Sequence, residues 1–190
     1  MATAPAAGLG LLLILALAGC TATQPTDPQQ NYVSGDGTVT EFAATDRGNP
    51  IVFSGTTEHG EAISSDDLAG KVVVVNFWYA TCPPCRLEAP WLEELYRKYS
   101  QEGVEFLGVN VRDDAAAALV FAETFEVTYP SIIDRDAEVV LAFSGIASPT
   151  AVPTTVVLGV DGRPASRIVG LIDKSILDAL IRSALAESGS

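Results

Sequence analysis

Residues 71–90 read Lys71-Val-Val-Val-Val-Asn-Phe-Trp-Tyr-Ala-Thr-Cys-Pro-Pro-Cys-Arg-Leu-Glu-Ala-Pro90. The part from Val72 to Trp78 is almost entirely β-branched or aromatic, which is typical of a parallel strand with both faces buried. After it, apolar residues recur at three- and four-residue spacing, as on the buried stripe of a helix: Leu87, Trp91, Leu92, Leu95, Tyr96 and Tyr99. The sequence therefore predicts a central strand that leads directly into a helix.

Two cysteines, Cys82 and Cys85, stand at the predicted junction of strand and helix. Pro83 and Pro84 suit the first turn of a helix, where no backbone N–H is needed for an intrahelical bond. Free N–H groups and the helix dipole stabilise an anion at a helix start, so a thiolate there is expected to have a lowered pKa. We predict that Cys82 is the outer, more exposed sulfur and the nucleophile, and that Cys85 attacks second.

A Cys-x-x-Cys pair also supplies half of many zinc sites. The rest of the chain offers only Cys20 and His59 as further sulfur or imidazole ligands, so a closed four-ligand site would need both. We therefore predict a redox-active dithiol that uses no metal and no cofactor. His59 lies in a predicted turn beside a glutamate and a glycine, and we interpret it as a solvated histidine without a catalytic role.

The N-terminal segment, residues 1–19, is predicted to be a signal peptide. Its apolar run, residues 9–18, is too short for a mature membrane span. The run ends in Leu17-Ala-Gly-Cys20, which resembles the lipobox of bacterial lipoproteins. That resemblance makes Cys20 the lipid-bearing first residue of the mature chain, held in the membrane by more than one acyl chain. One feature departs from the pattern, because no Lys or Arg precedes the apolar run.

Residues 20–45 are predicted to be the lipidated cysteine and a flexible tether, since they are polar and offer little to bury. Residues 46–190 are enough for one domain with a proper core. The formal net charge of −13 argues against nucleic-acid binding and against adhesion to anionic lipid, because both need a basic surface. We therefore expect the lipid to provide the membrane attachment.

Before the central strand, residues 51–63 are typical of a β-hairpin and residues 64–70 of a single helical turn. After the cysteine helix, alternating strand and helix patterns predict a mostly parallel sheet with helices on both faces. These elements are a strand at 104–111, a helix capped by Asp113 and Asp114 with Leu119, Phe121, Ala122 and Phe125 on its apolar side, a strand at 129–134 and a short helix at 138–143.

The last part of the chain predicts two antiparallel strands, 154–159 and 164–169, joined by a two-residue turn at Asp161-Gly162. Antiparallel strands added to a parallel core make a central mixed sheet flanked by helices. Asp173 is then predicted to cap a final helix. The apolar face of that helix comprises Ile176, Leu177, Leu180, Ile181, Ala184 and Leu185.

Together these motifs resemble the thioredoxin superfamily: a buried strand ending in Trp78, a Cys-Pro-Pro-Cys motif opening a helix, and, much later, Val152-Pro-Thr-Thr155. Within it, the chain is similar to the TlpA/ResA-like group of membrane-tethered thiol-disulfide oxidoreductases. It shares with that group the segment Asp67-Leu-Ala-Gly-Lys71, Asn76 before Phe-Trp, and a long interval between Cys85 and Pro153. The resemblance implies an α/β, thioredoxin-like fold with an N-terminal β-hairpin and a central αβ insertion. Thr81 departs from the group, in which many members have Trp before the first cysteine.

By the same resemblance, Pro153 is the cis-proline that packs against the active-site sulfurs, and the backbone of Val152 pairs with an extended substrate segment. Trp78, beneath the active-site turn, and Pro83, between the cysteines, are expected to contribute to the substrate site. Glu88 matches a glutamate that lies near the dithiol in this group, where its carboxylate can take the proton from the second cysteine. The residues alone leave another interpretation open, in which Glu88 is a solvent-facing helical glutamate.

The resemblance implies an extracytoplasmic enzyme that reduces disulfides in partner proteins, such as apocytochrome c during cytochrome c maturation. A membrane thiol transporter would resupply the electrons. Helix-start stabilisation of a thiolate favours an oxidant, whereas the nearby Glu88 favours a reductant, so the sequence leaves the direction open. One alternative is a disulfide-forming oxidase with the same site. The other is a non-catalytic module that binds Cu(I) through the two sulfurs.

Overall fold

The run of valines forms the central strand of the molecule, β5 (Val72–Trp78), in which every residue is buried. A computed structural model describes residues 1–2, 32–33, 38–148 and 151–188. On one side β5 pairs in parallel with β6 (Val104–Asn110), and on the other it pairs antiparallel with β8 (Thr154–Leu158). Both neighbours are themselves largely buried, so the predicted central strand is confirmed.

The main sheet has seven strands in the order β1-β2-β9-β8-β5-β6-β7. β7 (Ser131–Ile133) continues the parallel half beside β6, while β9 (Pro164–Val169) lies antiparallel to β8. The sheet is therefore mixed, as predicted. β2 (Val39–Glu41) pairs antiparallel with β9, and β1 (Tyr32–Val33) forms the edge beyond it.

The edge strands correct the predicted start of the domain at residue 46. Val39 and Ala43 are buried, and Val39 pairs with Ile168 in the register of the sheet. The composition of residues 20–45 predicted a tether throughout because the short segment that enters the sheet carries few apolar residues. Cys20 and the predicted signal peptide fall outside the described residues, apart from residues 1–2.

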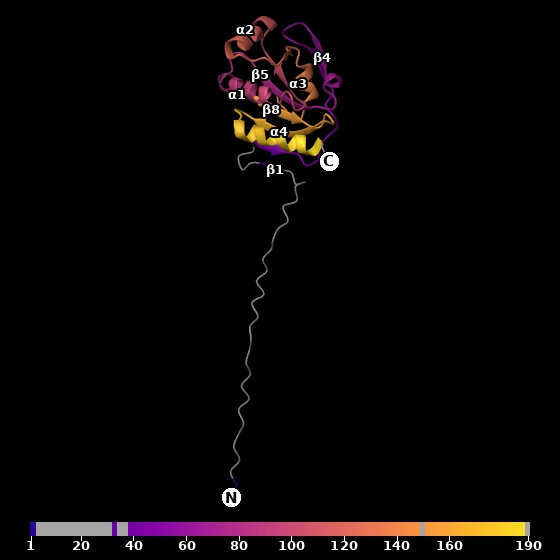
Figure 1. The fold of residues 1–190 in the computed structure, drawn as a ribbon, viewed down its shortest axis with the longest axis vertical. Coiled ribbons are helices and arrows are strands. Elements are labelled where there is room, and N and C mark those ends of the chain that lie inside the picture. Colours follow the sequence, from indigo (N-terminus) through magenta and orange to yellow (C-terminus); the bar gives the residue numbers. More distant parts are fainter. Residues whose placement is uncertain (3–31, 34–37, 149–150, 189–190) are drawn as a thin grey trace.

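Helices and a small hairpin cover the two faces of the main sheet. One face packs against α1 (Pro83–Tyr99), α4 (Lys174–Ser188) and α2 (Ala115–Phe125). The other packs against the hairpin formed by β3 (Ser54–Thr56) and β4 (Ala62–Ser64), the 3-10 turn Ser65–Leu68, and α3 (Glu138–Ala142). Figure 1 shows α4 at one side of the domain and α3 with the β4 segment toward the other.

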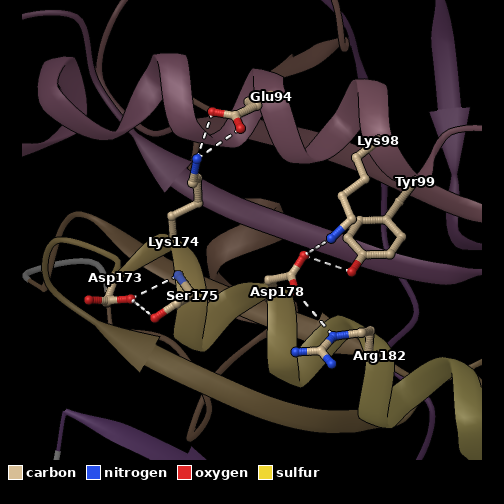
Figure 2. Close-up of polar contacts among 8 residues, drawn as sticks. All are labelled: Glu94, Lys98, Tyr99, Asp173, Lys174, Ser175, Asp178 and Arg182. Atoms are coloured by element: carbon tan, nitrogen blue, oxygen red, sulfur yellow. Dashed lines mark hydrogen bonds and ion pairs between the residues drawn. The ribbon is translucent and has the colours of Figure 1, made fainter.

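Polar contacts join the outer surfaces of α1 and α4, as Figure 2 shows. The Lys174 ammonium donates to both Glu94 oxygens at 2.8 Å, and Asp178 accepts hydrogen bonds from Lys98 and from the Tyr99 hydroxyl. Exposed ion pairs each contribute about 0–1 kcal/mol. The buried residues that α1 and α4 contribute to one core cluster therefore supply most of the attachment between the two helices.

The predicted apolar stripe of α1 is wrong at its first two positions. Leu87 and Trp91 are 60% and 37% exposed, whereas Leu95 and Tyr99 are buried. The helix advances about 100° per residue, so a strict four-residue repeat rotates by about 40° at each step and leaves the sheet-facing side. The stripe that does face the sheet comprises Cys85, Glu88, Ala89, Leu92, Leu95 and Tyr99.

In each of the other two long helices, one residue that was predicted to lie on the buried face is exposed. Leu119 on α2 and Ile176 on α4 are 38% and 40% exposed, because each lies next to the buried stripe of its helix rather than on it. The predicted cap of α2 is half right. Asp114 is the N-cap, since it accepts a hydrogen bond from the Ala117 N–H at 2.9 Å. Asp113 instead accepts a hydrogen bond from the Ala80 N–H, in the loop before Cys82.

The β8–β9 connection differs from the predicted two-residue turn. The Gly162 N–H donates to the Gly159 carbonyl, so Val160 and Asp161 are the central residues of the turn. Gly162 follows with φ +73°, a conformation that suits glycine. Asp173 caps α4 as predicted, since its Oδ1 accepts from the N–H groups of Ser175 and Ile176. Within the described residues, no helix combines the length and the apolarity that a membrane span needs.

Candidate functional site

The two cysteines lie where the sequence placed them, at the start of α1. Cys82 is the N-cap residue, Pro83 and Pro84 occupy the first helical positions, and Cys85 follows in the first turn. The cysteines form a disulfide with their Cα atoms 5.3 Å apart. The Cys82 Sγ also accepts a hydrogen bond from the Cys85 N–H at 3.2 Å. A free N–H of the helix start therefore points at this sulfur, which is the arrangement that stabilises a thiolate.

Both sulfur-bearing residues are nearly inaccessible in this oxidised state. Cys82 is 1% exposed and Cys85 is 2% exposed, so the prediction that Cys82 is the more exposed of the two is wrong for the disulfide form. The reason is that both side chains pack into one apolar cluster with Trp78, Ala89, Ala118 and Phe121, against which Val152 also lies. Thr81 and Pro83, on either side of Cys82, are exposed.

Pro153 follows a cis peptide bond, as the resemblance implied. Val152, the residue before it, packs against the cluster that contains the dithiol, so the proline loop and the sulfurs are neighbours. The Pro153 carbonyl accepts a hydrogen bond from the Gly170 N–H at 2.8 Å, which ties this loop to the segment leading into α4. The backbone pairing of Val152 with a substrate stays a prediction.

Glu88 is fully buried, at 0% exposure, so the interpretation as a solvent-facing glutamate is wrong. Its Oε1 accepts a hydrogen bond from Asn76 Nδ2 at 2.8 Å, and its Oε2 accepts one from the Ile172 N–H at 3.1 Å. Burial raises the pKa of Glu88 from 4.5 to about 7, although the two hydrogen bonds oppose that rise. A carboxyl that titrates near neutral pH, one helical turn from Cys85, can accept or return a proton at working pH.

Asn76 positions this carboxyl, a role that was not predicted from the sequence. Its amide also donates to Thr155 Oγ1 at 3.1 Å, so one side chain links β5, α1 and β8. Asn76 is 4% exposed. A buried polar residue needs partners, and an amide within a run of valines was the signal in the sequence that such partners exist.

Trp78 forms the floor of the site together with residues from β6 and β7. Its ring lies 4.2 Å from that of Phe121, centroid to centroid, and its Nε1 donates to Ser131 Oγ at 3.3 Å. Gly108 makes room for this contact, since a Cβ atom there would lie 2.1 Å from Ser131 Oγ and 2.8 Å from Trp78 Nε1. Trp78 lies in one cluster with Cys82 and Cys85, beneath the active-site turn as predicted, and its contact with substrate stays a prediction.

Two charged side chains hold the loop that precedes Cys82. The Ala80 N–H donates to Asp113 Oδ2 at 2.5 Å, and Arg86 Nη1 donates to the Ala80 carbonyl at 3.2 Å. Asp113 also accepts from Asn110 Nδ2 at 3.0 Å. These contacts were not predicted, because Asp113 fitted a helix cap and no sequence pattern linked it to a loop 33 residues away.

The described residues contain no group of three or more His, Cys, Asp and Glu side chains arranged to hold a metal ion. His59 is largely exposed, and its Nε2 lies 3.8 Å from Glu58 Oε1. The reactive groups that the structure brings together at this site are the dithiol and the buried carboxyl of Glu88.

Comparison with known proteins identifies the family. The family model described as Redoxin matches residues 36–181. The chain belongs to the Redoxin family. It is 32% identical over 173 residues to the thiol-disulfide oxidoreductase ResA of Geobacillus kaustophilus, an alignment that covers 91% of each chain. These relatives and the dithiol geometry make the protein a thioredoxin-like thiol-disulfide oxidoreductase.

Solved structures agree with this assignment for the Redoxin domain. A DsbF homologue from Corynebacterium diphtheriae matches with a TM-score of 0.70 and 30% identity, covering 81% of this chain and 98% of that one. A secreted thiol-disulfide isomerase from Corynebacterium glutamicum matches with a TM-score of 0.74 and 26% identity, covering 83% and 98%. The predicted thioredoxin-like fold is therefore confirmed.

Proposed function

We propose that this Redoxin-family protein works outside the cytoplasm, tethered to the membrane through a lipidated Cys20, and reduces disulfides in partner proteins. The observation that carries the proposal is the pairing of a helix-start sulfur with a buried carboxyl. The Cys85 N–H donates to Cys82 Sγ, and Glu88 lies one turn into the same helix. The first arrangement suits a nucleophile, and the second suits a proton acceptor for the sulfur that attacks second.

The reaction consists of two thiol-disulfide exchanges. In the first, the Cys82 thiolate attacks one sulfur of the partner disulfide, so that a mixed disulfide forms and the other partner sulfur leaves as a thiolate. In the second, the Cys85 thiolate attacks Cys82 Sγ, forms the Cys82–Cys85 disulfide and releases the remaining partner sulfur. The partner gains two electrons and two protons, and the enzyme dithiol loses them.

Glu88 would act in the second exchange. A thiol attacks only after it loses its proton, and the Glu88 carboxylate can accept the proton of Cys85 at a pH near its pKa of about 7. An ionised Glu88 also disfavours a thiolate nearby by like-charge repulsion. The same repulsion favours the disulfide over the dithiolate, which makes the dithiol a better electron donor.

Apocytochrome c is the substrate that the ResA resemblance suggests, and a membrane thiol transporter is the corresponding electron source. The location outside the cytoplasm has support from the lipobox-like sequence before Cys20 and from the similarity to a secreted thiol-disulfide isomerase. The formal net charge of −13 argues against a nucleic-acid substrate, which would need a basic surface.

A disulfide-forming oxidase is the second candidate, since a specific contact favours it. The N–H that points at Cys82 Sγ stabilises the reduced form, and a stabilised thiolate makes a dithiol–disulfide couple more oxidising. The contact at Cys82 and the carboxyl of Glu88 thus favour opposite directions of electron flow.

The equilibrium potential of the Cys82/Cys85 couple against glutathione separates these candidates. A reductant should have a potential close to that of thioredoxin, about −270 mV, whereas an oxidase should lie near about −120 mV. A Cys85→Ser variant provides the second test, because it should accumulate mixed disulfides at Cys82 with its partners. Recovery of no covalent partner from cells that express this variant would contradict the proposed activity.

A further inference from the structure

Arginines without an acidic partner gather at the dithiol end of the sheet, although the chain has a formal net charge of −13. All three lysines and four of the eight arginines form ion pairs with carboxylates. In the described part of the chain, the arginines that form no ion pair are Arg86, Arg112, Arg135 and Arg167. All of these except Arg167 follow the carboxyl ends of β5, β6 and β7, which run parallel and end at one edge of the sheet.

Arg112 combines a free guanidinium with a fixed position. The residue is exposed, and its Cζ lies over the Tyr79 ring, 3.8 Å from the ring centroid. Its backbone N–H donates to Asn110 Oδ1 at 3.0 Å, which holds the start of the loop after β6. Among the described residues, the guanidinium N–H groups have no acceptor. A guanidinium stacked on a ring keeps its donors in one plane, in a fork that matches a carboxylate.

The carboxylates beside Arg112 in the sequence are engaged elsewhere. Asp113 accepts hydrogen bonds from the Ala80 N–H and from Asn110 Nδ2, and Asp114 caps α2. Neither forms an ion pair with Arg112 within the structure described. The guanidinium is therefore open to an acidic group that comes from another molecule.

Tyr79 places this cation close to the reacting sulfur. The Cys82 N–H donates to the Tyr79 carbonyl at 3.1 Å, and the Cα atoms at the two ends of such a turn lie within about 7 Å of each other. Tyr79 also packs against the cluster that contains Cys82 and Cys85. An extended partner chain advances about 3.3–3.6 Å per residue. A side chain two or three residues from the attacked cysteine can therefore reach Arg112.

We propose that Arg112 is a specificity-determining residue that binds an Asp or Glu carboxylate of the substrate polypeptide, within about three residues of the cysteine that Cys82 attacks. The proposal rests on the proposed exchange reaction and adds the class of polypeptide that reacts fastest. A guanidinium already held on a ring can donate two parallel hydrogen bonds to a carboxylate and loses little conformational freedom on binding. Substrates with an acidic residue at that position therefore react faster than substrates with the neutral amide.

The test uses the reduced protein and two homodimeric disulfides of a short single-cysteine peptide with blocked termini. The two differ only in having Glu or Gln two residues to either side of the cysteine. Each rate is divided by the rate at which 2-mercaptoethanol, an uncharged thiol, reduces the same peptide, so that the intrinsic reactivity of the peptide cancels. At about 0.15 M salt the distant acidic surface is largely screened, whereas a direct contact is not. The wild-type protein should then favour the Glu peptide about fivefold, the upper end for an exposed ion pair.

Arg112→Gln should bring this ratio close to one, and salt at about 1 M should lower the ratio of the wild type. A substitution that only disturbed the structure would slow both peptides and keep their ratio. Arg112→Lys keeps the charge without the planar fork and should retain part of the preference.

Arg182→Gln is the matched control, because it makes the same change in net charge on α4. There Arg182 pairs with Asp178, which contacts Tyr99 at the opposite end of α1 from the cysteines. This variant should keep the wild-type ratio. Equal normalised rates for the two peptides with the wild-type protein, or an unchanged ratio in Arg112→Gln, would overturn the role of Arg112 while leaving the exchange activity intact. A wild-type protein that reduces neither peptide would instead refute the proposed function.

Discussion

Replacing Glu88 by glutamine should remove a large part of the dependence of stability on pH. Glu88 is fully buried, and burial raises its pKa from 4.5 to about 7. Between these two pH values the folded protein binds a proton at Glu88 more tightly than the unfolded chain does. Glu88 therefore contributes fully to the free energy of unfolding below about pH 4.5, and this contribution is lost as the pH rises to about 7.

The expected size of this loss is about 3 kcal/mol, since each pKa unit corresponds to about 1.36 kcal/mol. A glutamine side chain keeps an acceptor oxygen for Asn76 but does not titrate, so the Glu88→Gln variant should lack the decline. The measurement is urea unfolding of the oxidised protein at several pH values from about 4.5 to about 8, compared between wild type and variant. Glu94→Gln, on the exposed side of the same helix, is the control and should follow the wild type. Parallel curves for Glu88→Gln and wild type would refute the reasoning.

Three further substitutions test the surroundings of the site. Asn76→Ala removes the hydrogen bond that favours ionised Glu88, so the pKa of Glu88 in the folded protein should rise further, and the decline in stability should continue to a higher pH in the same urea titration. Gly108→Ala should destabilise the protein by about 1–3 kcal/mol, because the new Cβ would overlap Ser131 Oγ. A second change, Ser131→Gly, should recover part of that loss, and no destabilisation by Gly108→Ala in thermal unfolding would contradict the packing. Asp114→Ala removes the N-cap of α2 and should cost about 1 kcal/mol in urea unfolding, whereas Asp114→Asn should cost less.

The parts of the fold that the sequence predicted well are those in which a local pattern and the tertiary environment agree. The valine run of β5 is buried on both faces, and a β-branched apolar strand has no other stable place in a soluble domain. Cys82 and the two prolines after it define a helix start by backbone chemistry alone, and the helix begins there. Such features require no knowledge of what lies across the sheet.

The parts that failed depend on contacts between distant segments. Leu87 and Trp91 fit an apolar repeat and are nevertheless exposed. Which face of a helix lies on the sheet depends on packing as well as on the repeat. Asp113 had a plausible local partner as a cap and instead contacts Ala80, 33 residues away. From the sequence, Glu88 could be either a solvent-facing glutamate or a carboxyl near the dithiol. Its burial depends on contacts with Asn76 of β5 and with the Ile172 N–H before α4, both far along the chain.

The most direct test of the central claim is the pH dependence of alkylation of Cys82 by iodoacetamide in the Cys85→Ser variant, followed by mass spectrometry. An N–H at the helix start that stabilises the Cys82 thiolate should give rapid alkylation with a midpoint clearly below about 8.5, the ordinary pKa of a cysteine thiol. A midpoint at or above about 8.5, or a sulfur that does not react in the reduced protein, would contradict the claim that Cys82 is the nucleophile of a thiol-disulfide oxidoreductase.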